Sequence, residues 1–263
     1  MKLNIVAARD GVQWARDGVR VFFRQPLAMA GLFFMFMAAL SLAAFLPLVG
    51  GLLALVLVPA LTVGLMAAAR TADEGRFPMP STLFIAFRQG PQATRAMLML
   101  GLLYAVAVLL VMGVSALIDG GRFAQLYVNG GGITPEVVTD PQFRVAMWAS
   151  TLLYLPVSVA FWHAPALVHW HGVAPVKSLF FSLVAVVKNT RAYLLYGLVW
   201  MALSFAGGLL LLVLAAVSGS AGIASAGLLP VAMLVASMFF TSLWFTFRDC
   251  FSPDDALPAT EAP

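Results

Sequence analysis

The three histidines are the residues whose type and spacing come closest to a chemical site. His163, His169 and His171 lie within nine residues and alternate with Trp162 and Trp170. A metal site needs ligands that converge on one point, and offsets of six and eight residues do not share a helix face. The stretch also supplies no cysteine or carboxylate ligand. The pattern therefore favours interfacial histidines in an aromatic belt over a metal centre.

His163 lies deepest in the apolar stretch and is the histidine that we expect to matter most. For its side chain we expect a hydrogen bond to a neighbouring span rather than proton relay, because no carboxylate is embedded to accept the proton. Elsewhere no serine has a histidine and acid partner, no glycine loop can cradle a phosphate, and no carboxylate pair shares a helix face. Cys250 is the only cysteine, which excludes an internal disulfide. We expect no enzyme active site, no cofactor and no metal.

Composition indicates a membrane protein. Of the 263 residues, 62% are apolar and 10% are charged, and the mean hydropathy is +0.97. Apolar runs of about 18 residues or more can cross the ~30 Å hydrocarbon core as helices. We find about six such runs, at about 27–45, 48–69, 96–118, 143–168, 193–217 and 222–247. The sequence therefore predicts an all-α, polytopic transmembrane helix bundle within residues 26–248.

Cations in the loops set the expected orientation. Thirteen of the fifteen lysines and arginines fall on one side of the predicted spans, and Arg122 and Arg144 fall on the other. The positive-inside rule places the richer side in the cytoplasm, and an even number of spans brings both termini there. The same rule explains the pI of 9.6 without a nucleic-acid partner. Because arginine outnumbers lysine, as in GC-rich bacterial genomes, we expect a multi-pass protein of a bacterial inner membrane.

The segment 1–25 has the pattern of a cytoplasmic amphipathic helix. Its polar stripe follows the helical period and consists of Arg9, Gln13, Arg16, Asp17, Arg20 and Arg24. Such a helix, carrying Trp14, is typical of a segment that lies against anionic lipid headgroups. The alternative is a cap packed on the bundle, and the sequence leaves both open. We expect the acidic, proline-containing tail 249–263 to be disordered.

A weak threefold repeat runs through the chain. Each odd-numbered span follows a short apolar or amphipathic segment that ends in a cation and a side-chain amide. These pairs are Arg24 and Gln25, Arg88 and Gln89, and Lys188 and Asn189. We interpret them as marking three parallel units, each with one interfacial helix and one hairpin. Chance similarity between apolar segments is the alternative.

The second span of each hairpin also carries a proline, at Pro59, Pro165 and Pro230. Proline removes a backbone donor and can kink a helix. In a transporter such breaks can mark a substrate site at the membrane midplane. They are also common in bundles without that role, so the sequence alone does not assign one here.

Residues 161–193 carry a resemblance to a known group of proteins. They contain F-W-H-A-P-A-L-V-H-W-H-G, then S-L-F-F-S-L and K-N-T-R-A-Y. This stretch resembles an uncharacterised family of multi-spanning inner-membrane proteins of betaproteobacteria and their relatives. The N-terminal R-Q-P and V-P-A-L sequences are similar to a wider group that includes membrane-anchor domains of bacterial glycerophosphodiester phosphodiesterases. The phosphodiesterase catalytic domain is absent here, so the resemblance implies topology and no activity.

These features favour a non-enzymatic protein that organises lipid or binds partner proteins at the inner membrane. Its expected partners are the lipid bilayer, with anionic lipid at the cytoplasmic face, and a further membrane protein. The alternative is a transporter or pore for a neutral or lipid-like solute, which needs no embedded charge. A pore would show a continuous polar seam through the bundle, whereas a scaffold would show a well-packed core and an exposed cytoplasmic surface that looks conserved.

The orientation can be tested with reporter fusions. We expect a fusion at Gly131 to report the periplasm, and fusions after Arg70, Lys188 and Pro263 to report the cytoplasm, because the cations gather on that side. Paired alkaline phosphatase and fluorescent protein reporters measure this directly. A cytoplasmic signal at Gly131 would overturn the orientation.

Overall fold

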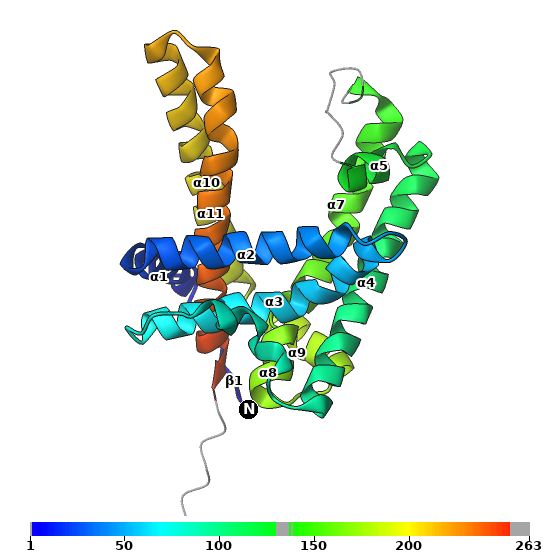
Figure 1. Cartoon of the computed structure of the whole chain (residues 1–263), viewed down its shortest axis with the longest axis vertical. Coiled ribbons are helices and arrows are strands. Elements are labelled where there is room, and N and C mark those ends of the chain that lie inside the picture. Colours follow the sequence, from blue (N-terminus) through cyan, green and yellow to red (C-terminus); the bar gives the residue numbers. More distant parts are fainter. Residues whose placement is uncertain (1, 130–136, 138, 253–263) are drawn as a thin grey trace, which may run out of the picture.

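The computed structural model describes residues 2–129, 137 and 139–252, which are almost entirely helical (Figure 1). Six helices are long and apolar enough to cross a membrane. They are α2 (Pro26–Ala44), α3 (Gly50–Asp73), α4 (Pro91–Asp119), α7 (Pro141–Trp162) continued by α8 (Ala164–His171), α10 (Thr190–Ser218) and α11 (Ala221–Cys250). The expected all-α polytopic bundle is confirmed. The expectation of a disordered tail at 249–263 is wrong for its first four residues. Asp249 and Cys250 end α11, and Phe251–Ser252 form a strand whose backbone pairs with Lys2–Leu3. Residues 253–263 lie outside the described residues.

Shorter elements connect and flank these helices. They are β1 (Lys2–Leu3), α1 (Asp10–Arg24), η1 (Pro80–Phe87), α5 (Arg122–Asn129), α9 (Pro175–Lys188) and β2 (Phe251–Ser252). The two strands pair antiparallel, with Lys2 opposite Ser252 and Leu3 opposite Phe251. This pairing brings both ends of the described chain to the same side of the molecule, which agrees with an even number of spans.

The three short helices α1, η1 and α9 pack in a recurring way. In chain order the hairpins are α2–α3, α4–α7 and α10–α11. Helix η1 packs on α3, and α9 packs on α7, so each lies against the second helix of the hairpin before it. Helix α1 has no hairpin before it and packs instead on α11, the second helix of the last hairpin. The order of packing is therefore cyclic, since the last hairpin gives α1 the partner that the preceding hairpin gives η1 and α9. This arrangement supports the interpretation of the chain as three related units.

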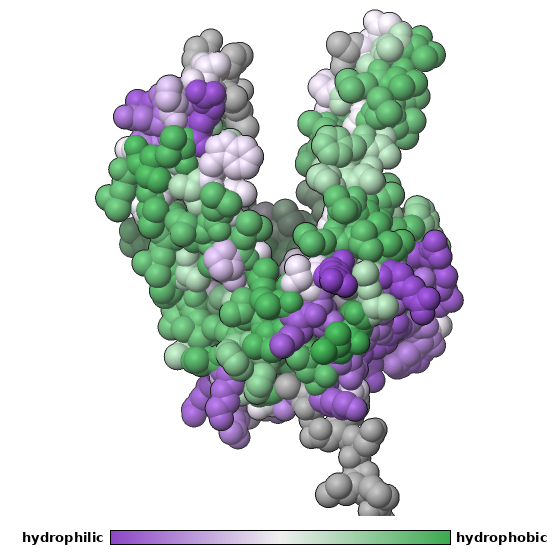
Figure 2. Space-filling model, turned by 180° about the vertical axis from the view of Figure 1, so that it is seen from behind, coloured by the Kyte–Doolittle hydropathy of each residue, from purple (hydrophilic) through white to green (hydrophobic). Residues whose placement is uncertain are grey.

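The hairpins do not form a parallel bundle. The α4–α7 and α10–α11 hairpins diverge as two arms, while α2 and α3 run across between them (Figure 1). Helix α3 packs against α2, α4, α8 and α11, and its Ala60–Ala69 segment is almost wholly buried. The arms meet at their lower ends, where Trp162 packs edge-on against Tyr193 and Tyr196. A deep notch separates their upper parts, whose surfaces are largely apolar (Figure 2).

The fourth predicted span, 143–168, is broken rather than continuous. Helix α7 ends at Trp162, His163 has φ −105° and ψ −14°, and α8 begins at Ala164. Pro165 is the second residue of α8, where its missing N–H costs no helical hydrogen bond. Pro59 and Pro230 instead lie inside the continuous helices α3 and α11. Of the three prolines at related positions, one therefore coincides with a break between two helices.

Only part of the segment 1–25, predicted to be one amphipathic helix, is helical: α1 begins at Asp10, because the backbone of Lys2–Leu3 pairs with β2 instead. Helix α1 caps the bundle through its small residues. A Cβ atom placed on Gly11 would lie 2.0 Å from the Ala192 carbonyl oxygen, and one on Gly18 would lie 2.3 Å from the Ser242 Cβ. Trp14 is fully buried between these glycines, so it does not anchor the helix in lipid. One face of α1 therefore packs on the bundle, as the alternative of a packed cap predicts. Four arginines around the other face stay exposed, namely Arg9, Arg16, Arg20 and Arg24.

This close approach yields a stability prediction. We expect Gly18→Ala to lower the free energy of unfolding by about 1–3 kcal/mol, because the added methyl group overpacks the contact with Ser242. Gly31→Ala in α2 is the matched control, since nothing lies within 4 Å of its added Cβ. Thermal denaturation of the purified protein in detergent measures both. Equal melting temperatures for the two variants would refute the close packing.

Candidate functional site

The three cation and amide pairs lie where a short helix meets the following span. The cations Arg24, Arg88 and Lys188 are exposed. Each amide contacts a segment remote in the chain. Gln25 donates to the Arg76 carbonyl oxygen at 3.1 Å, and the Gln89 amide nitrogen lies 3.4 Å from His169 Nε2. Asn189 makes the most extensive contacts of the three.

Asn189 is buried and holds the N-terminal segment against the bundle. Its Oδ1 accepts a hydrogen bond from the Val6 backbone N–H at 2.8 Å. Its Nδ2 donates to the carbonyl oxygens of Asn4 at 3.1 Å and Ala185 at 3.0 Å, and lies 3.7 Å from Cys250 Sγ. These contacts lie at the lower end of the α10–α11 arm, where the two arms meet, and we call this region the base (Figure 1). They join the segment after β1 to α9, to the start of α10 and to the end of α11, and we call them the base knot.

His163 lies beside the base knot and is fully buried. Its Nε2 hydrogen-bonds the Tyr193 hydroxyl on α10, which is the hydrogen bond to a neighbouring span expected from the sequence. Its backbone N–H donates to the Ser182 hydroxyl at 2.9 Å. His169 contacts Gln89 instead, so these two histidines face different neighbours. Among the described residues, no group of three or more His, Cys, Asp or Glu side chains is placed to hold a metal ion.

Two of the three prolines face one central cavity of about 250 Å³ between α3, α4, α7, α8 and α11. Pro59 and Pro165 line it, whereas Pro230 lies elsewhere on α11. Tyr104 and Tyr154 also line it, and their hydroxyls hydrogen-bond each other at 2.9 Å. Both tyrosines lie near the middle of their helices, although tyrosine is usually enriched at membrane interfaces.

The chemistry of the central cavity suits a weakly polar molecule. Its walls are mostly aromatic and aliphatic, and Phe161 packs edge-on against Tyr104 with centroids 5.1 Å apart. The hydroxyls of Thr62 and Ser158 also line the cavity and donate to carbonyl oxygens of their own helices. The cavity has no lysine, arginine or acidic residue in its lining. It can therefore offer hydroxyl contacts and apolar surface, but no charge.

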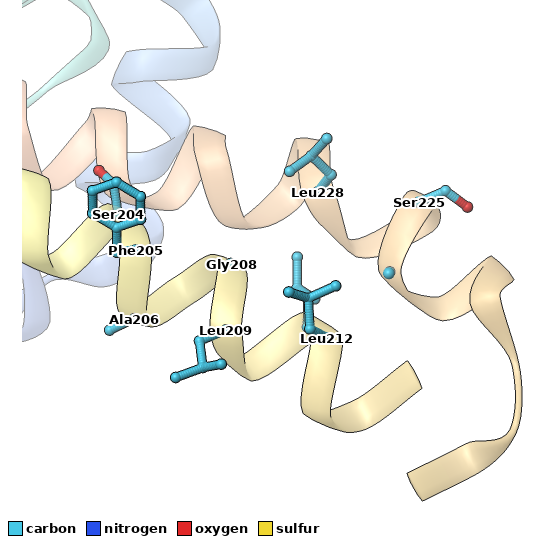
Figure 3. Close-up of a pocket in the computed structure, with 10 residues that line it drawn as sticks. Ser204, Phe205, Ala206, Gly208, Leu209, Leu212, Ser225 and Leu228 are labelled. Atoms are coloured by element: carbon cyan, nitrogen blue, oxygen red, sulfur yellow. The ribbon is translucent and has the colours of Figure 1, made fainter. Parts of the chain in front are cut away.

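A second apolar space opens between the two helices of the α10–α11 hairpin. This hairpin crevice has a volume of about 730 Å³ and lies between the Ser204–Leu212 part of α10 and residues Ser225 and Leu228 of α11 (Figure 3). A neighbouring space of about 480 Å³ shares Ser204 and Leu228 with it and reaches Phe239. Phe239 also lines the central cavity, so an apolar surface extends from the arm to the centre of the molecule.

Sequence reasoning missed the tyrosine pair and the pairing of β1 with β2. A tyrosine in the middle of a span is a usable signal, because its hydroxyl needs a partner in hydrocarbon. The partner itself cannot be identified from periodicity, since Tyr104 and Tyr154 are 50 residues apart.

Comparison with known proteins found one informative similarity. The chain is 37% identical over 254 residues to a protein of Burkholderia thailandensis named as a probable inner membrane protein, covering 95% of this chain and 94% of the relative. No protein-family model matches the chain, and no solved structure matches it. The resemblance to phosphodiesterase membrane anchors therefore receives no support from these comparisons.

The base knot yields a prediction about local stability. We expect Asn189→Ala to speed hydrogen exchange at the Val6 amide and to destabilise the protein by about 1–3 kcal/mol, because the partly buried backbone groups of Val6 and Asn4 lose their hydrogen-bond partner. The matched control is Thr190→Ala, whose hydroxyl bonds only carbonyl oxygens of the preceding helical turn within the described structure. Hydrogen exchange with mass spectrometry compares the two. Unchanged protection of residues 2–7 in both variants would contradict the role of Asn189.

Proposed function

This chain belongs to the same family as the Burkholderia thailandensis inner membrane protein, and from that premise we propose that it is a non-enzymatic, lipid-organising protein. The observation that carries the proposal is the divergence of two apolar arms from one closed base (Figure 1, Figure 2). The arms expose large apolar side chains, including Leu110, Leu152, Phe205 and Leu228. In a bilayer these surfaces contact lipid or the spans of a further membrane protein.

The apolar spaces support a lipid-binding role more than a pore. The hairpin crevice and the central cavity are lined mainly by apolar side chains, and their few hydroxyls do not form a continuous polar seam across the described structure. Around the base, α1, α3, α10 and α11 pack closely, with Trp14, Leu61, Tyr196 and Phe245 all but fully buried. The packed base supports a scaffold over a pore.

We further propose that the protein catalyses no reaction. The histidines are the strongest candidates for chemistry, and the contacts of His163 and His169 are those of structural residues. His163 bonds Tyr193 within the core, and His169 contacts Gln89 between α8 and the start of α4. Catalysis by either histidine would require a reacting group beside it.

The proposed orientation has both termini in the cytoplasm. The pairing of β1 with β2 supports a common side for the two ends. The base, where these strands lie, also carries the exposed arginines of α1, whereas α5 lies in the upper part of one arm (Figure 1). An excess of cations at the base is the pattern that the positive-inside rule assigns to the cytoplasm.

The exposed stripe of α1 is the part that we propose meets anionic lipid. Residues 2–24 carry five cations and two carboxylates, five minus two leaving a net excess of three. At about 1 kcal/mol per cation near an anionic surface, this excess contributes about 3 kcal/mol at low salt. Because the opposite face of α1 packs on the bundle, the arginines are held in a fixed row rather than on a mobile peptide.

A transporter for a neutral or lipid-like solute is the second candidate function. The specific observation in its favour is the central cavity, where Pro59, Pro165 and the hydroxyl pair of Tyr104 and Tyr154 come together. The shared Phe239 joins this cavity to the space beside the hairpin crevice. Movement of fluorescent lipid between leaflets of proteoliposomes distinguishes the two functions, since a scaffold leaves the lipid distribution unchanged.

Lipid analysis tests the proposed function. Extracted from membranes with a styrene–maleic acid copolymer, the wild-type protein should carry more anionic lipid than the bulk membrane. We expect the triple change Arg9→Glu, Arg16→Glu and Arg20→Glu to abolish this enrichment, because it reverses the charge of the exposed stripe. The same three positions changed to lysine should preserve it.

A control on the opposite side of the predicted spans separates the effect of charge on α1 from the effect of the net charge of the protein. Arg122→Glu with Arg144→Glu changes the net charge without touching α1. If the wild-type protein carries lipid of bulk composition, the lipid-organising proposal is wrong. If the opposite-side control loses the enrichment as fully as the glutamate triple variant, the assignment to α1 is wrong.

A further inference from the structure

A groove of about 500 Å³ lies where the last turns of α3, α8 and α11 meet, and we call it the end groove. Each of these turns ends the second span of a hairpin, so all three units contribute to one site. Helix C-termini carry partial negative charge, and each of these turns holds a basic residue, namely Arg70, His171 and Arg248. Positive and negative groups therefore lie side by side in the end groove.

Arg70 presents guanidinium donors to the end groove. Its Nε donates to Glu74 Oε1 at 3.0 Å, and its guanidinium carbon lies 5.4 Å from the centre of the Trp244 ring. Within the described residues its terminal Nη groups make no hydrogen bond. The aromatic ring and the carboxylate thus fix the orientation of a planar donor that can still bind a phosphate.

Arg248 is positioned in a similar way from α11. Its Nε donates to Asp249 Oδ1 at 2.8 Å, and its guanidinium carbon lies 4.9 Å from the centre of the Phe245 ring. Its Nη atoms lie 3.5 Å from Asp73 Oδ2 and 3.9 Å from Asp17 Oδ2. These distances are long for charge-assisted hydrogen bonds, so the terminal donors are available to a closer anion.

The two carboxylates of the end groove have different roles. Both oxygens of Glu74 are engaged by Arg76 and Arg70, and these hydrogen bonds hold the pKa of Glu74 below its usual value. Glu74 therefore stays ionised and orients Arg70. Among the described residues, the Asp73 carboxylate has only the long contact with Arg248, so it is the group that can accept a hydrogen bond from a ligand ammonium.

Tryptophan rings form the wall of the end groove. Trp170 and Trp244 are half-buried and pack edge-on with centroids 5.2 Å apart. Indole rings concentrate at the headgroup level of membranes, where one edge meets lipid and the other meets polar groups. The wall therefore indicates that a ligand of the end groove reaches it from the membrane surface.

We propose that the end groove binds the headgroup of a zwitterionic, amine-bearing phospholipid, the class of phosphatidylethanolamine. The phosphate lies against Arg70 and Arg248, and the ammonium lies against Asp73. Two arginines and two carboxylates line the groove, so a ligand with one charge of each sign matches it better than an anion does. This inference rests on the proposed function only in placing the base at the membrane surface.

Native mass spectrometry of the full-length protein in detergent tests the proposal. The probes are phosphatidylethanolamine, phosphatidylcholine and phosphatidylglycerol with identical acyl chains. For the binding that is lost when Arg70 and Arg248 are changed, we expect phosphatidylethanolamine to bind roughly tenfold more tightly than the other two lipids, because one charge-assisted hydrogen bond to Asp73 provides a difference of that size. Phosphatidylcholine lacks an N–H donor for this bond, and phosphatidylglycerol lacks the ammonium.

Variants make the test specific. We expect Asp73→Asn to reduce binding of phosphatidylethanolamine and to raise binding of phosphatidylglycerol, a gain that misfolding cannot produce. The double variant Arg70→Gln with Arg248→Gln should weaken binding of all three lipids, whereas the exposed control Arg88→Gln should match the wild type. An Asp73→Asn variant with unchanged preference overturns the assignment of the ammonium site.

The remaining outcomes separate this inference from the proposed function. Equal binding of all three lipids by the wild type overturns the end groove as a headgroup site and leaves lipid enrichment at α1 intact. Binding of none of the three overturns both. Glycerophosphoethanolamine that binds as tightly as the intact lipid would assign the groove to a soluble ligand and overturn the lipid proposal.

Discussion

The arrangement of this molecule depends on the hydrogen bonds of Asn189 at its base. The buried side-chain amide of Asn189 accepts a hydrogen bond from Val6, donates to Asn4 and Ala185, and contacts Cys250. It therefore joins both ends of the described part of the chain to the junction of α9 and α10. Unpaired polar groups in an apolar interior are costly, so these contacts are made or lost together. They hold the base closed while the hairpins above it diverge.

Because the arms diverge above a closed base, their apolar surface is exposed rather than hidden. In water such surface would be buried, but lipid chains are as apolar as leucine and do not force the arms together. The hairpin crevice and the central cavity can therefore remain open inside the bilayer. The charged residues are kept near the base and in the upper part of the arm that carries α5, where water and headgroups solvate them (Figure 2).

The three units share one packing rule but have diverged in detail. Each short helix lies on the second helix of a hairpin, yet α1 is a regular helix of 15 residues and η1 is a 3-10 helix of eight. The amides follow the same trend, since Asn189 is buried whereas Gln89 is exposed. The three short helices therefore share a packing position but differ in helix type and in the burial of the amide that follows each of them. The end groove lies where the three second helices end together.

The sequence by itself determined the helices and much of their order. Helices are the only open-chain structure that satisfies its own backbone within hydrocarbon, so apolar length alone identified the six spans. A hydrogen bond from His163 to a neighbouring span could be expected from the sequence, because His163 lies deepest in its apolar stretch and no embedded carboxylate is available to accept its proton. Only the tertiary structure decided that α7 and α8 break at His163, that Trp14 is buried, and that Tyr104 meets Tyr154. The reason is physical: faces toward lipid and faces toward another helix are equally apolar, so periodicity cannot tell them apart.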